Sequence, residues 1–324
     1  MADIVQLEGD IFQVDLRECG YEGRTAGYFV RGSGGWALVE TGPASSAGVV
    51  REAAAQLGIE PEQLKYIAVT HIHIDHAGGL GVLARHFPGA GLVVHPKGAR
   101  HMIDPSRLIA GALQVWGEEK MRQYGDIVPV EEGRVLHAVE GAVLDLGDRK
   151  IEVWETPGHS KNHVCYYDAA TGGLFSGDAA GVYSPGLSQR LRRPVLRPAT
   201  PAPDFNGEQM FSSLLRIAAS EIKQIYFTHF GAGRPPRLLV ENIIGQLTVF
   251  MHMGRQCLQQ GGGAREAADA LAAVMRRYAR FGLLEEEDVP AGMDGRMAQE
   301  WDFMVGMTKL SAQGIVQYLA KTSG

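Results

Sequence analysis

The sequence predicts an α/β protein with two sheets between outer helices, followed by an all-helical C-terminal extension. Three observations predict this arrangement. Short β-rich runs fill the first forty residues, strand and helix patterns then alternate, and the apolar residues repeat at helical spacing after Phe230. We therefore expect an α/β domain over residues 1–232 and a helical extension over residues 233–324.

The N-terminal part is predicted to begin as an antiparallel sheet. Short β-rich runs lie at Ile11–Val14, Ala26–Val30 and Trp36–Val39, with Gly-rich turns between them. Residues 45–57 then have the spacing of an amphipathic helix, and Tyr66–Val69 reads as a short buried strand. At this point the chain changes to β-α-β order.

The middle of the chain continues this alternation. Helical patterns cover residues 79–86 and 106–124, and a further helix–strand pair covers residues 207–227. The strand patterns between them lie at residues 92–94, 143–146, 151–156, 164–167 and 174–176.

The C-terminal part is predicted to be helical throughout. Pro235-Pro236 opens an apolar-periodic helix that runs toward Gln260, where glycines 261–263 stop it. Leu271, Val274 and Met275 lie on one face of a second helix, and a third helical face runs toward Tyr318.

Composition narrows the partners. The 324 residues carry a formal net charge of −6, so no overall positive field attracts nucleic acid. The N-terminal residues do not have the pattern of a signal peptide, and no apolar run is long enough for a membrane span. We expect a cytoplasmic protein without a membrane partner.

Cys19, Cys165 and Cys257 are too widely spaced for a metal knuckle and are expected to be buried apolar residues.

One short motif carries most of the functional information. The segment His71-Ile72-His73-Ile74-Asp75-His76 has the form HxHxDH, which arises by chance in fewer than about one chain in a thousand. Residues two apart in an extended segment point to the same side, so His71 and His73 can bind one metal ion. A turn into a helix beginning near Ala77 would direct Asp75 and His76 toward a second ion. Imidazole and carboxylate ligands suit zinc, with iron or manganese as alternatives.

Four ligands leave a two-metal site incomplete, so further His or Asp residues should follow other strands. Three do. His159 follows the strand that ends near Thr156, Asp178 follows the strand at 174–176, and His229 follows the strand that ends at Phe227. A carboxylate at Asp178 can bridge both ions.

These residues give residues 8–232 a clear resemblance to the metallo-β-lactamase superfamily. The resemblance implies an αββα sandwich with a catalytic site at the sheet edges. It also implies that one metal is bound by His71, His73 and His159, a second by Asp75, His76 and His229, and that Asp178 bridges them. All seven positions match the hydrolase pattern.

Differences from particular groups within the superfamily make some of their activities less consistent with this sequence. True β-lactamases commonly have a cysteine at the position of Asp178, and oxygen-reducing diiron members have a glutamate at that of His73. Nucleic-acid-processing members insert a large domain that this chain does not accommodate. Members usually have an aspartate where Glu40 stands. A helical extension after the last ligand resembles glyoxalase-II-like thioesterases, in which that extension would supply the substrate pocket.

The pattern predicts hydrolysis of an ester-type bond, either a thioester or a lactone, by a water activated between two divalent ions. Asp75 is the candidate for proton transfer, and Tyr183 the candidate donor to a developing oxyanion. We expect a loop of about 28 residues after Asp178 to contact substrate. A basic run within it is a candidate for binding a carboxylate or phosphate: Arg190, Arg192, Arg193 and Arg197.

Several of these candidate residues also have an ordinary structural interpretation. Tyr183 is equally well a packed aromatic residue, and the arginines a solvated loop or an oligomer contact. His163 is expected to support the site or pack beside it. The remaining histidines are expected to be ordinary polar residues: His86, His95, His101, His137 and His252.

Other activities remain open. One alternative is a mononuclear iron enzyme that resembles the persulfide dioxygenases of the superfamily. A phosphodiesterase is another, and a binding or signalling protein with little turnover is a third. The substrate in each case is a small molecule, and the apolar helical extension makes a homodimer plausible.

Overall fold

The computed structural model describes residues 1–260, 263–283 and 295–322. The chain forms two compact units. The first comprises Met1–Glu155 and Asn162–Gly177, and the second comprises Thr156–Lys161 and Asp178–Gly324. Two glycines of the predicted helix stop, 261–262, and residues 284–294 of the predicted extension lie outside the described residues. The predicted domain boundary between residues 232 and 233 stays a prediction.

The first unit contains a seven-stranded mixed sheet in the order β1 to β7. Its antiparallel half follows from short connections such as the two-residue turn at Ser33-Gly34, and its parallel half from helical crossovers. The predicted antiparallel opening and the change to β-α-β order are thus confirmed. The strands are β1 (Ile4–Gln6), β2 (Ile11–Asp15), β3 (Ala26–Gly32), β4 (Gly35–Val39), β5 (Leu64–Ala68), β6 (Gly91–Val94) and β7 (Val135–His137).

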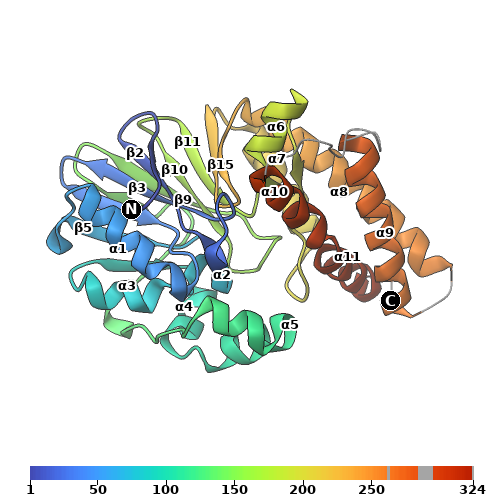
Figure 1. Cartoon of the computed structure of the whole chain (residues 1–324), viewed down its shortest axis with the longest axis horizontal. Helices are drawn as coiled ribbons and strands as arrows, with labels where there is room; N and C mark the ends of the chain where they lie inside the picture. Colours follow the sequence, from blue (N-terminus) through green and yellow to red (C-terminus); the bar gives the residue numbers. More distant parts are fainter. Residues whose placement is uncertain (261–262, 284–294, 323–324) are drawn as a thin grey trace. The chain divides into compact units, whose positions relative to one another are not determined.

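Helices pack on this sheet through apolar side chains. Val50, Leu83, Leu38 and Ile67 belong to one buried cluster, which joins two helices to two strands. In Figure 1, α1 and α3 accordingly lie beside β5. The helices of the unit are α1 (Ala47–Gln56), α2 (Ile74–Ala77), α3 (Leu80–His86), α4 (Pro96–Ile103) and α5 (Ser106–Tyr124).

Four further strands of the first unit form an antiparallel meander, which is part of a six-stranded sheet in the order β15-β14-β11-β10-β9-β8. They occur where the sequence predicts them and end close to the predicted positions. They are β8 (Val143–Asp145), β9 (Lys150–Glu155), β10 (Val164–Asp168) and β11 (Gly173–Gly177).

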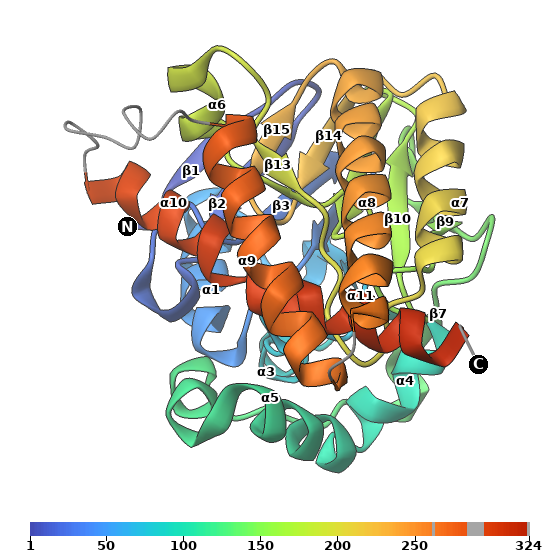
Figure 2. The same ribbon diagram turned by 90° about the vertical axis from the view of Figure 1, so that its right-hand side faces the viewer.

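The second unit is mainly helical. Helices α8, α9 and α11 pack closely against one another, as Figure 2 shows. The approach requires a small residue on α8, because a Cβ atom at Gly254 would lie 2.9 Å from Leu319 and 3.4 Å from Leu271. The helices are α7 (Gly207–Ala219), α8 (Pro236–Gln259), α9 (Ala264–Leu283), α10 (Gly295–Gly306) and α11 (Thr308–Thr322). Strands β14 (Gln224–Phe227) and β15 (Gly231–Gly233) pair antiparallel.

The segment after Asp178 differs from the prediction. The expectation of a loop of about 28 residues is wrong, because strand β12 (Val182–Tyr183), helix α6 (Pro185–Leu191) and strand β13 (Leu196–Arg197) lie within it. The side chain of Ser184 caps α6 by accepting a hydrogen bond from the Leu187 N–H, and Pro185 occupies the first turn. The two strands are too short to give a periodic pattern.

None of the described helices combines the length and apolarity that a membrane span requires.

Candidate metal centre

The HxHxDH segment lies where strand β5 gives way to helix α2. The backbone is extended at His73 (φ −60°, ψ 148°), and α2 begins at Ile74, three residues before the predicted start. His71 and His76 are buried, whereas His73 and Asp75 are half-buried. Nε2 of His71 lies 2.8 Å from Nδ1 of His73, so the two rings present nitrogens to the same place.

The other ring nitrogens of this segment contact neighbouring side chains. Nδ1 of His76 lies 3.2 Å from Oε2 of Glu40, and Nδ1 of His71 lies 3.1 Å from Oγ1 of Thr70. Glu40 also accepts a hydrogen bond from the Thr70 N–H at 3.1 Å. Glu40, which stands where the superfamily usually has an aspartate, therefore reaches the ligand segment. Contacts of this kind fix the tautomer and orientation of a metal-binding imidazole.

His163 packs beside the same segment. Its ring stacks on that of His71 with centroids 5.0 Å apart. A Cβ atom at Gly177 (φ +48°) would lie 2.7 Å from Nε2 of His163 and 2.4 Å from Oγ1 of Thr70, so only glycine fits there. This contact agrees with the supporting or packing role expected of His163.

The second unit places two candidate imidazole ligands, His159 and His229, around the carboxylate of Asp178. Nε2 of His159 lies 3.4 Å from Oδ2 of Asp178, and Nε2 of His229 lies 3.7 Å from Oδ1. One imidazole thus stands near each oxygen of the Asp178 carboxylate. Nδ1 of His159 lies 3.0 Å from the carbonyl oxygen of Ala199, which leaves Nε2 directed at Asp178.

Local backbone contacts hold these side chains. Gly158 precedes His159 with φ +140°, and a Cβ atom there would lie 2.3 Å from Cα of Met210. The carbonyl oxygen of His229 accepts a hydrogen bond from the Tyr183 N–H, and the Phe230 N–H donates to the Tyr183 carbonyl oxygen at 3.0 Å. Pairing with the Tyr183 backbone therefore sets the position of His229.

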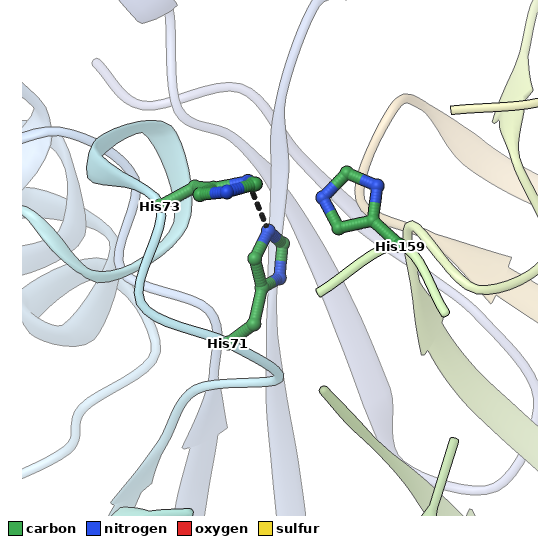
Figure 3. A group of neighbouring side chains, drawn as sticks. All are labelled: His71, His73 and His159. Carbon is green, nitrogen blue, oxygen red and sulfur yellow. Dashed lines mark hydrogen bonds between the residues drawn. The ribbon is translucent and has the colours of Figure 1, made fainter. Parts of the chain in front are cut away.

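The candidate ligand atoms fall into three groups, and within each group all atoms lie within 4.8 Å of one another. Figure 3 shows the first group. His71 belongs to two of the groups, and so does His76. Imidazole nitrogens and carboxylate oxygens at mainly buried positions are a donor set that suits a divalent metal such as zinc. The groups are His71, His73 and His159; His71, His76 and Asp178; and Asp75, His76 and His229.

The other candidate residues have different surroundings. Tyr183 is half-buried, and its ring stacks on Phe227 with centroids 5.0 Å apart. This packing agrees with the ordinary structural interpretation, and the oxyanion role of Tyr183 stays a prediction. Arg197 is buried, whereas the other three arginines of the basic run are exposed. The four therefore do not form one exposed basic patch.

Two neighbours of the cluster could not be predicted from any pattern in the sequence. The Ala199 contact is made by a backbone carbonyl, which no side-chain pattern reveals. Phe303 on α10 lies with its ring centroid 5.5 Å from that of His229, although it is distant in the sequence.

Comparison with known proteins identifies the family. A family model described as the metallo-beta-lactamase superfamily matches residues 20–229, which is more than half of the chain. The chain belongs to the metallo-β-lactamase superfamily. The predicted αββα fold with a helical C-terminal region is thereby confirmed.

Relatives of this superfamily protein include named hydrolases. An acyl-coenzyme A thioesterase, MBLAC2, from Bos taurus is 28% identical over 232 residues, which cover 65% of this chain and 76% of the relative. A hydroxyacylglutathione hydrolase from Maricaulis maris is 31% identical over 161 residues, 49% of this chain and 46% of the relative. The chain thus spans less than half of that second relative. These findings confirm the expectation of a metal-dependent hydrolase.

A solved structure shows the same fold over nearly the whole chain. The archaeal metallo-β-lactamase superfamily protein ST1585 from Sulfolobus tokodaii superimposes with a TM-score of 0.64 at 22% sequence identity. The match covers 94% of this chain and 97% of ST1585. At this identity the likeness establishes the fold alone.

Proposed function

We propose that this protein is a thioester hydrolase that works with two divalent metal ions, most simply zinc. The observation that carries the proposal is the cluster of seven His and Asp side chains, whose ligand atoms fall within 4.8 Å of one another in each group. The proposed ligands are His71, His73 and His159 for one ion, Asp75, His76 and His229 for the other, and Asp178 for both.

When bound, the ions supply a water that is deprotonated near neutral pH and a Lewis acid for the substrate carbonyl. The chain's own residues do the rest. Asp75 is half-buried at the start of α2 and is the proposed acceptor of the proton that the nucleophile loses. Tyr183 is the proposed hydrogen-bond donor to the oxyanion that forms on the substrate.

The buried partners of the imidazoles support this assignment. Glu40 on His76 and the Ala199 carbonyl oxygen on His159 each occupy Nδ1, which keeps Nε2 of both rings available as a ligand. These two contacts therefore hold the rings of His76 and His159 in a fixed orientation.

The choice of a thioester rests on relatives and on one ligand. One named relative is an acyl-coenzyme A thioesterase and the other a hydroxyacylglutathione hydrolase, and the acyl group of an acylglutathione is joined to sulfur as a thioester. Asp178 stands where true β-lactamases commonly have cysteine, which disfavours β-lactams. A lactone is the second ester-type candidate, and the C-terminal helices are the proposed source of the substrate pocket because Phe303 lies beside His229.

The test is metal analysis combined with a substrate panel. The protein is purified, its metal content is quantified, and it is assayed against short acyl thioesters, lactones and phosphodiesters. We expect two metal ions per chain and thioester cleavage with kcat/KM at least 100-fold above that for phosphodiesters. The Asp178→Asn variant, which weakens the shared ligand, should lose metal and activity together.

Other outcomes of this assay contradict the proposal. One iron per chain with oxygen consumption on a persulfide would identify a dioxygenase, and preferred cleavage of phosphodiesters a phosphodiesterase. Two bound ions with no turnover of any ester would point to a binding protein.

A further inference from the structure

One arginine of the basic run has an environment unlike the others. Arg197, on β13, is 8% exposed, whereas Arg190, Arg192 and Arg193 are exposed to solvent. Removing a guanidinium group from water is costly unless an anion or hydrogen bonds compensate for the lost hydration. The burial of Arg197 therefore calls for a specific explanation.

The protein supplies only part of that compensation. Nη1 of Arg197 donates a hydrogen bond to Oγ of Ser311 at 3.3 Å, and the guanidinium carbon lies 5.9 Å from the ring centroid of Phe303. Buried Nε has no hydrogen-bond partner among the described residues. Guanidinium offers five N–H donors in a planar fork, so Arg197 retains donor capacity that the protein does not use.

The backbone of Arg197 is held firmly. Strand β13 pairs with β12 so that Arg197 lies opposite Val182. A Cβ atom at Gly181 (φ +84°) would lie 2.4 Å from the carbonyl oxygen of Arg197, so this approach needs glycine. The side chain is therefore presented from a fixed position and is preorganised.

Two of the proposed metal ligands of the second unit lie near Arg197, His229 across the Phe303 ring and Asp178 within range of its charge. The Phe303 ring contacts both the guanidinium group of Arg197 and the ring of His229. Burial lowers the pKa of Arg197 to about 10, and the negative charge of Asp178 acts in the opposite direction. Arg197 thus remains charged at neutral pH.

Asp178 does not remain available as a counter-charge when it binds metal. If two divalent ions were bound, their charge would exceed that of the carboxylates of Asp75 and Asp178 and of a metal-bound hydroxide taken together, so a further anion would compensate the buried guanidinium group of Arg197 better than Asp178 alone. A substrate group can be that anion. The planar fork of arginine matches a carboxylate in two parallel hydrogen bonds.

We propose that Arg197 binds a carboxylate of the substrate, so that the enzyme selects thioesters with a carboxylate near the scissile bond. That the scissile bond is a thioester rests on the proposed function. The preference for a substrate with a carboxylate rests on the surroundings of Arg197. The exposed arginines of the same segment have no part in this selection.

The kinetic test uses matched substrate pairs that differ by one charge. S-acetyl-3-mercaptopropionate and its methyl ester place the carboxylate on the thiol side, and the S-ethyl thioester of succinate and its methyl ester place it on the acyl side. We expect wild type to prefer the acid in at least one pair. Arg197→Met should reduce that preference, the ratio of the two kcat/KM values, by about 30-fold, and Arg197→Lys should reduce it less.

Arg190→Met is the matched control, because it removes an exposed arginine from the same segment. It should leave the preference ratio within about twofold. Wild type that handles acid and methyl ester equally in both pairs would overturn the proposal without any variant. An unchanged ratio in Arg197→Met would overturn it as well.

A binding measurement separates this inference from the proposed function. Calorimetry on the metal-loaded protein should show glutarate binding that weakens by about 30-fold in Arg197→Met but not in Arg190→Met, with neutral glutaramide as the uncharged comparison. If no thioester is cleaved yet glutarate binding depends on Arg197, the proposed function fails and the anion site stands. If thioesters are cleaved and glutarate binds equally to wild type and Arg197→Met, only the anion site fails. If Arg197→Met does not fold, equal affinity of the wild-type protein for glutarate and glutaramide would still refute the proposed anion site.

Discussion

Glu40 contacts His76 through one carboxylate oxygen and the start of the ligand segment through the other. Oε2 lies 3.2 Å from Nδ1 of His76, and Oε1 accepts the Thr70 N–H at 3.1 Å. Both Glu40 and His76 have 0% exposure, so this pair is shielded from solvent. A glutamate therefore orients the imidazole here, one methylene longer than the residue the superfamily usually has.

Glu40→Gln should weaken metal binding by about 10- to 100-fold, because the amide orients His76 less strongly and makes it less basic. Competition with a chromophoric chelator measures the affinity. The exposed Glu62 supplies a control, since Glu62→Gln should leave metal affinity as in wild type. Equal affinity of Glu40→Gln and wild type would contradict an orienting role for this carboxylate.

Asp75→Asn should lower kcat by about 10²- to 10⁴-fold, the usual contribution of a positioned proton acceptor. The comparison is made on protein whose metal content has been measured, because Asp75 is also a proposed ligand. Full metal occupancy with wild-type turnover would remove Asp75 from the proton-transfer step. Loss of metal in proportion to loss of turnover would assign it to binding alone.

Removing the metal with a chelator should lower the stability of the folded protein as well as its activity. The unfolded chain has no preformed metal site, so the ions bind and stabilise the folded chain. At a free metal concentration 100 times the dissociation constant, one site adds about 2.7 kcal/mol to the free energy of unfolding. Thermal unfolding with and without chelator measures the shift. Asp178→Asn should show a smaller shift than wild type, and an equal shift in both would argue against the shared carboxylate.

The candidate ligands could be singled out from the sequence because they follow strands, and their role as metal ligands stays a prediction. HxHxDH is contiguous, and His159, Asp178 and His229 each follow a periodic strand pattern, so their meeting could be inferred from topology. Most of the longer helices and strands were predicted because their apolar residues repeat at a clear period, but helix α4, which spans eight residues, was not predicted. Helix α6 could have been found too, since Ser184 followed by Pro185 is a helix-start signal.

Features that depend on tertiary contacts could not be predicted from the sequence. Nothing in the basic run distinguishes Arg197 from Arg193, because burial arises from β13 pairing with β12 and from the helices that cover it. Strands of two residues have no period to detect. Phe303 reaches His229 from a helix far along the chain, and no local pattern encodes such a contact.

Glu300 on α10 and Ser184 at the start of α6 should stabilise the second unit jointly. The hydroxyl of Ser184 donates a hydrogen bond to the buried carboxylate of Glu300, and the Leu187 N–H lies 3.4 Å from the same oxygen. Glu300→Gln and Ser184→Ala should each reduce the free energy of unfolding by about 1–3 kcal/mol.

A double-mutant cycle on Glu300 and Ser184 measures whether the effects are coupled. We expect the double variant to lose less than the sum of the single variants, by about 0.5–3 kcal/mol. Asp302→Asn, at an exposed position of the same helix, is the control for α10. Strict additivity would show that the two residues act independently.

His95 should make the stability of the first unit depend on pH. Its side chain caps α4, where Nδ1 accepts a hydrogen bond from the Lys97 N–H at 3.0 Å. Burial lowers the pKa of His95 below its ordinary value of 6.5, against the opposing charge of Glu155 and with smaller contributions from Lys97 and His137. A protonated ring could not accept the capping hydrogen bond.

Because the pKa of His95 is lowered in the folded protein, the free energy of unfolding should decrease as the pH decreases. Below about pH 6.5 the unfolded chain binds a proton that the folded chain resists, so the free energy of unfolding falls as the pH falls, by at most about 1.4 kcal/mol per pH unit from this group. His95→Asn keeps a capping acceptor that does not titrate, and its unfolding free energy should change less between pH 7.5 and pH 5.5. Urea unfolding at the two pH values measures the difference, with His252→Asn at an exposed position as the control. If wild type and His95→Asn lose the same stability over this interval, a group other than His95 sets the acid sensitivity.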